Sequence, residues 1–272
     1  MKKNVSSIVY SILMFVGVTT LSASDEISAY LLGSHIEVNV AKTKLQDAGF
    51  EVIASYTPVE NGTTLVFTND ALKAQGAKPK RAHASVLRMF IDDKEKTISI
   101  TNPIYFGKAF MQDDYQESVF IDQYEKINSA FPGLTASKDK LDADDIASFH
   151  FMMGMPYYED QDELATGKNE ELIAKVKAYK EGKLLIFELK LSDNCTLLGF
   201  DIGDKTKEFV KKIGRANAAV LPYCISIEDA KATSLAAKYY LAVSYPQLSM
   251  GQFMTISSVP GAIEKDLKKP FE

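Results

Sequence analysis

The spacing of apolar residues changes several times along the chain, and each change predicts a new element. In residues 50–56 every second side chain is apolar, which is typical of a strand, and Asn61-Gly62 then marks a tight turn. Helical spacing, with apolar residues three and four apart, comes before and after this hairpin. The predicted elements of the first half are a helix at 38–48, strands at 50–56 and 63–67, a helix from Asn69 or Asp70, strands at 85–91 and 97–101, and a short helix at 103–111.

The second half of the chain shows the same succession of patterns. Its first helix has an apolar stripe that runs from Leu172 to Tyr179, and Gly214 ends its second helix. The predicted elements are this first helix, a hairpin of strands at 183–191 and 196–202, a helix from Asp204, and strands at 219–227 and 239–245.

The residues themselves repeat, as well as the pattern. The heptapeptide at 81–87, Arg-Ala-His-Ala-Ser-Val-Leu, returns at 215–221 as Arg-Ala-Asn-Ala-Ala-Val-Leu. Matching glycines, asparagines and phenylalanines extend the alignment on both sides, and an insertion at 228–238 is needed to match Pro103 with Pro246. We therefore expect an internal duplication.

This order of helices and hairpins predicts an α+β protein, in which an antiparallel or mixed sheet carries helices on one face. We expect two tandem two-layer α/β sandwich domains, related by internal duplication and by a pseudo-twofold axis, in a monomer. The boundaries that the patterns favour are a signal peptide at 1–24, a first sandwich domain at 25–112, a helical acidic linker at 113–168 and a second sandwich domain at 169–272.

The linker has no counterpart within the duplication. Apolar residues at helical spacing predict an amphipathic helix at 114–131, which Pro132-Gly133 ends. A second helix is expected from about Asp142 to Met153, and an acidic, exposed stretch follows at 157–163. Because amphipathic helices need an apolar surface, the linker is expected to cover one end of the pair of sheets.

Several strings in both halves resemble one bacterial family. Residues 49–54 (Gly-Phe-Glu-Val-Ile-Ala), 86–90 (Val-Leu-Arg-Met-Phe) and 221–229 (Leu-Pro-Tyr-Cys-Ile-Ser-Ile-Glu-Asp) are similar to the "domain of unknown function 302" family. The resemblance covers residues 36–111 and 169–254, implies a small α/β sandwich, and brings no catalytic residues with it. The first half departs from the family's Leu-Pro strand, since Arg88 follows Leu87.

The first residues have the features of a secretory signal peptide. Lys2 and Lys3 precede an apolar run at 8–18, and small residues give a cleavage site after Ala23 or Ser24. The run is shorter than the about 20 apolar residues that span a bilayer; an uncleaved anchor is the alternative. We expect a soluble protein of the bacterial periplasm, without stable membrane insertion after cleavage.

Charge and motif content narrow the classes of function. The net charge of −5 gives an acidic surface that repels phosphate backbones, so nucleic acid is not an expected partner. The sequence lacks the motifs of phosphate-binding loops, dinucleotide folds, zinc proteases, thiol redox centres and serine hydrolases. These observations favour a protein that is not an enzyme, and they name no cofactor.

Differences between the two copies indicate candidate site residues. Arg81 and Arg215 hold matching positions and are able to bind an anion bidentately, but structural bonds to linker carboxylates are the simpler interpretation. His83 matches Asn217, so an imidazole that is able to act as a base or ligand occurs in one copy only, but a locally satisfied polar residue is the favoured interpretation. The candidates for ligand binding are Arg81, His83, Arg215 and Asn217.

A second candidate is the run His-Phe-Met-Met-Gly-Met at 150–155. Thioethers and imidazole are soft ligands that suit Cu(I), but methionine also fills apolar gaps, and core packing is the favoured interpretation. The candidate metal ligands are His150, Met152, Met153 and Met155.

The two cysteines, Cys195 and Cys224, both lie in the second copy. They form either a disulfide, which an oxidising compartment permits, or two independent buried thiols. The sequence as a whole predicts an exported binding protein that holds a small ligand or a periplasmic partner between its two copies. The alternative is an enzyme or copper-handling protein with a site around Arg81 and His83.

Overall fold

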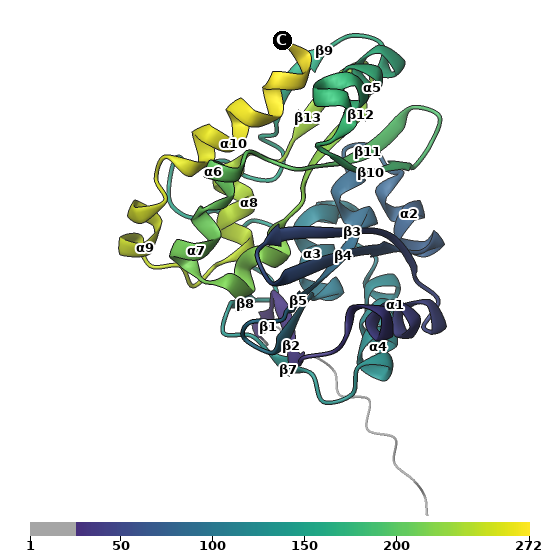
Figure 1. Ribbon diagram of the computed structural model, residues 1–272, viewed down its shortest axis with the longest axis vertical. Coiled ribbons are helices and arrows are strands. Elements are labelled where there is room, and N and C mark those ends of the chain that lie inside the picture. Colours follow the sequence, from purple (N-terminus) through teal and green to yellow (C-terminus); the bar gives the residue numbers. More distant parts are fainter. Residues whose placement is uncertain (1–25) are drawn as a thin grey trace, which may run out of the picture.

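Two antiparallel sheets form the centre of the molecule (Figure 1). The computed structural model describes residues 26–272, so the predicted signal peptide at 1–24 lies outside the described residues. The first sheet contains, in spatial order, β3 (Glu51–Val59), β4 (Gly62–Thr68), β5 (Leu87–Asp92), β6 (Thr97–Thr101), β2 (Tyr30–Ser34) and β7 (Thr135–Ala136). The second contains β10 (Leu185–Lys190), β11 (Cys195–Phe200), β12 (Tyr223–Glu228), β13 (Lys231–Ser234) and β9 (Asp162–Thr166).

The two sheets have the same strand order, apart from the short β7 at one edge of the first. We call residues 30–111 the first unit and residues 162–244 the second unit. The helices of the first unit are α1 (Val38–Asp47), α2 (Asp70–Gly76), the 3-10 helix η1 (Ala82–Ser85) and α3 (Pro103–Met111). Those of the second are α5 (Asn169–Ala178), the 3-10 turn η3 (Tyr179–Gly182), α6 (Asp204–Lys207), α7 (Phe209–Ile213), the 3-10 helix η4 (Arg215–Val220) and α8 (Ala237–Ser244). The predicted α+β class with antiparallel sheets is confirmed.

The sequence patterns did not indicate β2 and the short β7 in the first sheet, or β9 in the second. Leu31 of β2 pairs with Ile100 of β6, and Ala165 of β9 pairs with Ala232 of β13. Within β9 only Leu164 is buried, so the strand lacks the alternation of buried and exposed residues that a sequence pattern would reveal.

The strand predicted at 239–245 is wrong, because these residues form α8 and the turn after it. α8 follows β13 as α3 follows β6, so the insertion predicted at 228–238 is wrong as well. Only Asp229 and Ala230, both with positive φ, separate β12 from β13. Seven of the eight residues of α8 are buried, so the helix has no polar face. Its sequence therefore lacks the helical spacing of apolar and polar residues on which the prediction depends.

The linker has one of its two predicted helices. α4 (Glu117–Ala130) packs on α3 and α1 of the first unit, with Phe120 and Ile127 fully buried. The second helix, predicted at 142–153, is wrong: β8 (Lys140–Asp142) pairs with β1 (Glu26–Ser28), and residues 143–155 form turns. Ile146 is buried while Met153 is 96% exposed, so the apolar residues of this segment share no common face.

The two units meet through their sheets and 3-10 helices. Val66, Ala82 and Val86 of the first unit join a buried cluster with side chains of the second, namely Phe187, Leu189, Cys195, Leu197 and Cys224. In addition, η1 contacts β11 and β12, while η4 contacts β5 and β6. Each 3-10 helix thus packs on the sheet of the other unit.

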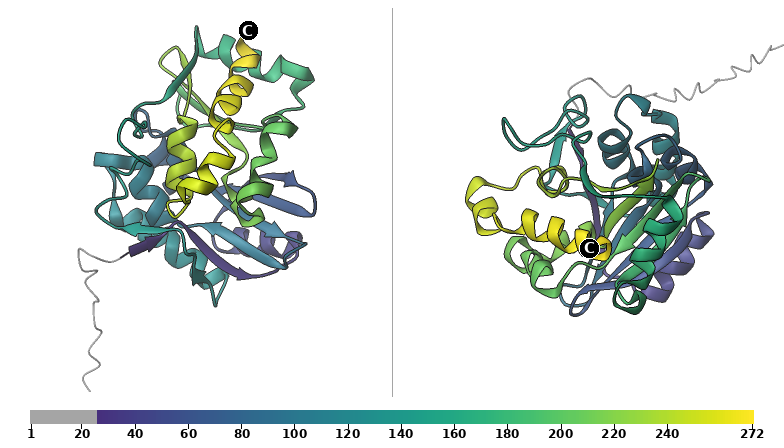
Figure 2. Two further views of the ribbon diagram at one scale, coloured as in Figure 1. Left: turned by 90° about the vertical axis from the view of Figure 1, so that its left-hand side faces the viewer. Right: turned by 90° about the horizontal axis from the view of Figure 1, so that it is seen from above.

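The C-terminal helices lie on the outside of the second unit (Figure 2). They are α9 (Met250–Thr255), α10 (Val259–Lys268) and the 3-10 turn η5 (Lys269–Phe271). α10 contacts α8, β9 and α6, and its Asp266 accepts hydrogen bonds from Gly203 N and Thr206 Oγ1. Among residues 26–272, no helix combines the length and the apolar character needed to cross a bilayer.

Candidate functional site

A small cavity lies where β5 of the first unit meets β12 of the second. Its volume of about 10 Å³, counted as the space open to the centre of a water molecule, is enough for about one water. Three of its lining residues come from the first unit and four from the second: His83, Arg88 and Phe110, and Tyr223, Cys224, Leu235 and Tyr240.

Arg88 supplies the positive charge of this cavity. It lies opposite Val66 in the ladder between β4 and β5, and because side chains alternate along a strand it shares the face of Val66 that packs on the second unit. Its Nη2 donates to Pro222 O at 3.3 Å and to Cys224 Sγ at 3.0 Å, while its buried Nε has no partner. A buried guanidinium with no carboxylate beside it carries a large desolvation cost.

The titratable neighbours of Arg88 are neutral at neutral pH. Burial, reinforced by the charge of Arg88, lowers the pKa of His83 to about 3, so the imidazole carries no charge. Burial raises the pKa of Tyr240 to about 12 and that of Tyr223 well above its ordinary value. It also raises the pKa of the Cys224 thiol, although the charge of Arg88 acts in the opposite direction. Arg88 is therefore the one charged group in the lining, since guanidinium does not lose its proton in proteins.

The cysteines do not form the disulfide that the sequence left open. Both thiols are free and buried. Cys224 lies opposite Gly199, whereas Cys195 lies opposite Glu228 at the far end of the same pair of strands. Four residues of strand separate the two positions by roughly 13 Å, which is beyond the about 7 Å that a disulfide spans.

Both candidate arginines bind carboxylates, and for Arg81 this confirms the favoured interpretation of structural bonds to the linker. Arg81 donates from Nε to Asp114 at 2.9 Å and from Nη1 to Glu159 at 2.7 Å, so it binds two carboxylates of the linker. Arg215 forms a buried ion pair with Asp92 at 3.0 Å. Of the candidates whose side chains the structure describes, Arg81, His83 and Arg215, His83 alone lines the cavity. The backbone of Asn217 belongs to η4.

The methionine run is not a core segment. Met153 is 96% exposed and Met152 is 42% exposed. The His150 ring lies 4.3 Å from that of Tyr157, and its two nitrogens lie 3.4 Å from Ser148 O and from the Tyr157 hydroxyl. The favoured interpretation of this run as core packing is therefore wrong.

Arg88 is the site residue that sequence reasoning missed, although a signal was present. It interrupts the apolar run Val-Leu-Arg-Met-Phe at 86–90, and the matching position of the second copy holds Pro222. A lone arginine inside a buried strand is rare without a partner. Tyr223 and Tyr240 gave no such signal, since aromatic residues are common in any core.

The burial of His83 has a measurable effect on stability. The unfolded chain binds a proton at His83 below about pH 6.5, whereas the folded protein does so only near pH 3. Stability should therefore fall as pH decreases through this window, by up to about 1.4 kcal/mol per pH unit from this group. In His83→Asn this part of the slope should disappear from denaturant titrations between about pH 5 and pH 7. His150→Asn is the control that should keep it, and an unchanged slope in His83→Asn would contradict the burial.

A larger hollow lies on the other side of the first unit. It has a volume of about 530 Å³ between β1, α3 and α4, and includes Ile27, Leu31, Ile104 and Tyr124. Its two buried polar residues already have partners: Asn102 caps α3 and donates to Ser28 O, and the Ser28 hydroxyl donates to Tyr30 O. No charged group here is buried as Arg88 is, so the hollow gives no comparable indication of a ligand.

Comparison with known proteins adds no assignment, since no family model, curated protein or solved structure gives a significant match. The resemblance to the family of domain of unknown function 302 stays a prediction. Within the described part of the chain, no three His, Cys, Asp or Glu side chains are grouped so as to hold a metal ion.

Proposed function

We propose that this protein binds a small monovalent anion at Arg88, in the cavity between its two units. The observation that carries the proposal is the buried guanidinium of Arg88, which is 5% exposed, whose Nε has no partner and whose titratable neighbours in the cavity lining are neutral. A bound anion would balance this charge and accept a hydrogen bond from the free N–H. Both effects would reduce the cost of burying the guanidinium.

The shape of the cavity limits the ligand. Room for about one water molecule fits a halide ion and is too small for sulfate or phosphate. The walls that face Arg88 are aromatic rings and a neutral thiol, which favour a weakly hydrated, polarisable anion over a strongly hydrated one. The site would therefore select anions by size and by ease of dehydration.

Nucleophilic catalysis by Cys224 is the alternative, because an arginine, a thiol and an imidazole line the same cavity. A thiol reacts as its thiolate, and the pKa of Cys224 is raised by burial, not lowered. No hydrogen bond joins Cys224 to His83 among the described residues, and the His83 Nε2 is without a partner. These observations favour binding over nucleophilic chemistry.

The test is the effect of halide on thermal stability. A ligand present at a hundred times its Kd stabilises by about 2.7 kcal/mol, which raises the Tm by about 5–10 °C in a protein of this size. Sodium chloride or bromide should raise the Tm along a saturable curve, whereas sodium sulfate at equal ionic strength should not. Arg88→Met should abolish the saturable increase without loss of stability in halide-free buffer, since an apolar isostere removes the uncompensated charge.

Arg81→Met is the matched control, because Arg81 is also a buried arginine but binds carboxylates of the linker and lies outside the cavity. It should keep the halide response. If Arg88→Met responds to halide as the unaltered protein does, the anion site is not at Arg88. If sulfate and halide act alike on all three proteins, salt acts without any specific site.

We also propose that the two units arose by internal duplication. Their common strand order supports it, and so does the way in which the 3-10 helix of each unit packs on the sheet of the other. Superposition of the two units on their strands should bring η1 onto η4, and a failure to do so would count against duplication.

Export to the periplasm is proposed from residues 1–24. The N-terminal residue of the chain recovered from the cell envelope should then be Ser24 or Asp25. A chain that still begins at Met1 or Lys2 would contradict cleavage.

A further inference from the structure

Exposed methionines gather on one part of the surface, and this feature is independent of the proposed anion site. The described residues include six large apolar side chains that are exposed: Val40, Met152, Met153, Tyr157, Met250 and Met254. Five of the six belong to two segments, the turn region at 150–157 and α9. Methionine usually fills gaps inside a core, so four exposed methionines in two segments call for an explanation.

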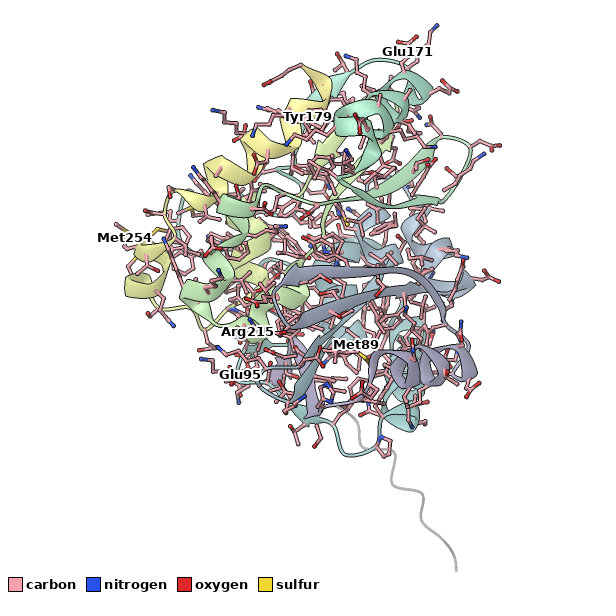
Figure 3. The ribbon with its side chains drawn as sticks, in the orientation of Figure 1. Met89, Glu95, Glu171, Tyr179, Arg215 and Met254 are labelled. Carbon is pink, nitrogen blue, oxygen red and sulfur yellow. The ribbon has the colours of Figure 1, made fainter. Side chains whose placement is uncertain are left out.

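The two segments lie side by side although they are far apart in sequence. The rings of Phe151 and Phe253 stack with their centroids 4.8 Å apart. Met152 and Met254 each come directly after one of these rings. We call Met152, Met153, Met155, Met250 and Met254 the thioether patch. Figure 3 shows Met254 at the outer edge of the molecule on α9.

The backbone of each segment brings its methionines together. Met155 N donates to Met152 O at 3.0 Å, which closes a four-residue turn, and Gly154 provides the positive φ of 82°. The Cα atoms at the two ends of such a turn lie within about 7 Å. On α9, Met250 and Met254 are four residues apart and therefore lie on the same helix face. A capping box between Ser249 and Gln252 fixes the start of this helix.

We infer that the thioether patch binds a soft monovalent metal ion, Cu(I) or its analogue Ag(I). Uncharged thioethers on long flexible side chains are ligands that such ions prefer over water, and hard divalent ions do not compete for them. Two ligands from the turn and one or two from α9 would complete a three- or four-coordinate sulfur site. The imidazole of His150 is not needed, since both of its nitrogens already lie near Tyr157 and Ser148.

An apolar docking surface for another protein is the other use of such a patch. It is less well supported, because leucine or isoleucine would serve that purpose, and the large apolar side chains that these two segments expose are four methionines and one tyrosine. Metal binding explains why the exposed apolar side chains at these positions are methionines.

The experiment is a titration of the purified chain with Ag(I), which is redox-inert, followed by the NMR signals of 13C-labelled methionine methyl groups. Addition of one equivalent should shift the signals of the thioether patch. Met89 and Met111 are fully buried in the first unit and serve as internal controls whose signals should stay in place. The inference fails if the patch signals do not move, or if silver is taken up by Cys195 and Cys224 alone.

Substitution then separates the ligands from their surroundings. Met152→Leu with Met254→Leu keeps the apolar surface and removes one sulfur from each segment. Silver affinity should fall at least about tenfold, while Val40→Leu, an exposed apolar change on α1, should leave it unaltered. Unchanged affinity in the double variant would overturn the assignment. Because neither variant touches the cavity, the halide response tests the anion site separately.

Discussion

Replacement of Asp92 by alanine should lower the free energy of unfolding by about 2–3 kcal/mol, because it leaves the largely buried guanidinium of Arg215 without its carboxylate and two backbone N–H groups of the hairpin without their acceptor. The Asp92 carboxylate, at the end of β5, is 2% exposed and Arg215 of η4 is 15% exposed. Arg215 also donates to the carbonyl oxygens of Glu60 and Asn61. Burial alone would raise the pKa of Asp92, but the guanidinium and two backbone N–H groups hold it below its ordinary value. Figure 3 shows where Arg215 lies between the two units.

The measurement is a urea titration of the unaltered protein and of the variant. Glu163→Ala is the control, because Glu163 forms an ion pair of similar length, 2.8 Å, with Lys231 but is half exposed. Its loss should cost no more than about 1 kcal/mol. If Asp92→Ala costs as little as Glu163→Ala, the pair between the units contributes no more than a surface contact.

Phe120→Ala should destabilise the protein by about 3–5 kcal/mol, as expected for an aromatic side chain removed from a close-packed core. The Phe120 ring is 1% exposed and stacks on Tyr115 at 5.3 Å. Its atoms would lie 2.5 Å from a Cβ on Gly107, so the ring rests directly on the backbone of α3. Phe120 itself is on α4, which belongs to the linker between the units, and the variant therefore tests whether the linker is part of the folded core.

Glu125→Ala lies on the exposed side of the same helix and should change stability by no more than about 0.5 kcal/mol. Thermal unfolding of both variants, followed by circular dichroism, decides the matter. An equally small effect of Phe120→Ala would mean that α4 is loosely attached and that the linker acts as a tether.

Sequence patterns predicted the elements that have one polar and one buried face. α4 was found within a few residues because Phe120 and Ile127 recur at helical spacing. α8 was mistaken for a strand because nearly all of it is buried, and a short apolar run has the same appearance in a strand and in a buried helix. Its position directly after β13 is set by tertiary packing, which no local pattern records.

The candidate site was predicted only in part, for a similar reason. His83 was singled out because its counterpart is Asn217, and it does line the cavity. Arg81 was singled out because it is repeated, yet its guanidinium binds Asp114 and Glu159. The partner of a charged side chain is fixed by contacts between distant segments. Comparison of the two copies therefore shows which residues differ, but it does not show which of them meet.

Because the 3-10 helix of each unit packs on the sheet of the other, neither sheet is fully covered until both units have been made. The inner face of the first sheet is covered by η4, which includes residues 215–220, more than a hundred positions after β5. During synthesis or translocation the N-terminal half emerges first, at a rate of about 5–20 residues per second during synthesis. Until the strands and the 3-10 helix of the second unit arrive, Val66, Val86 and the charge of Arg88 lack the residues that bury them, and this surface can contact other chains.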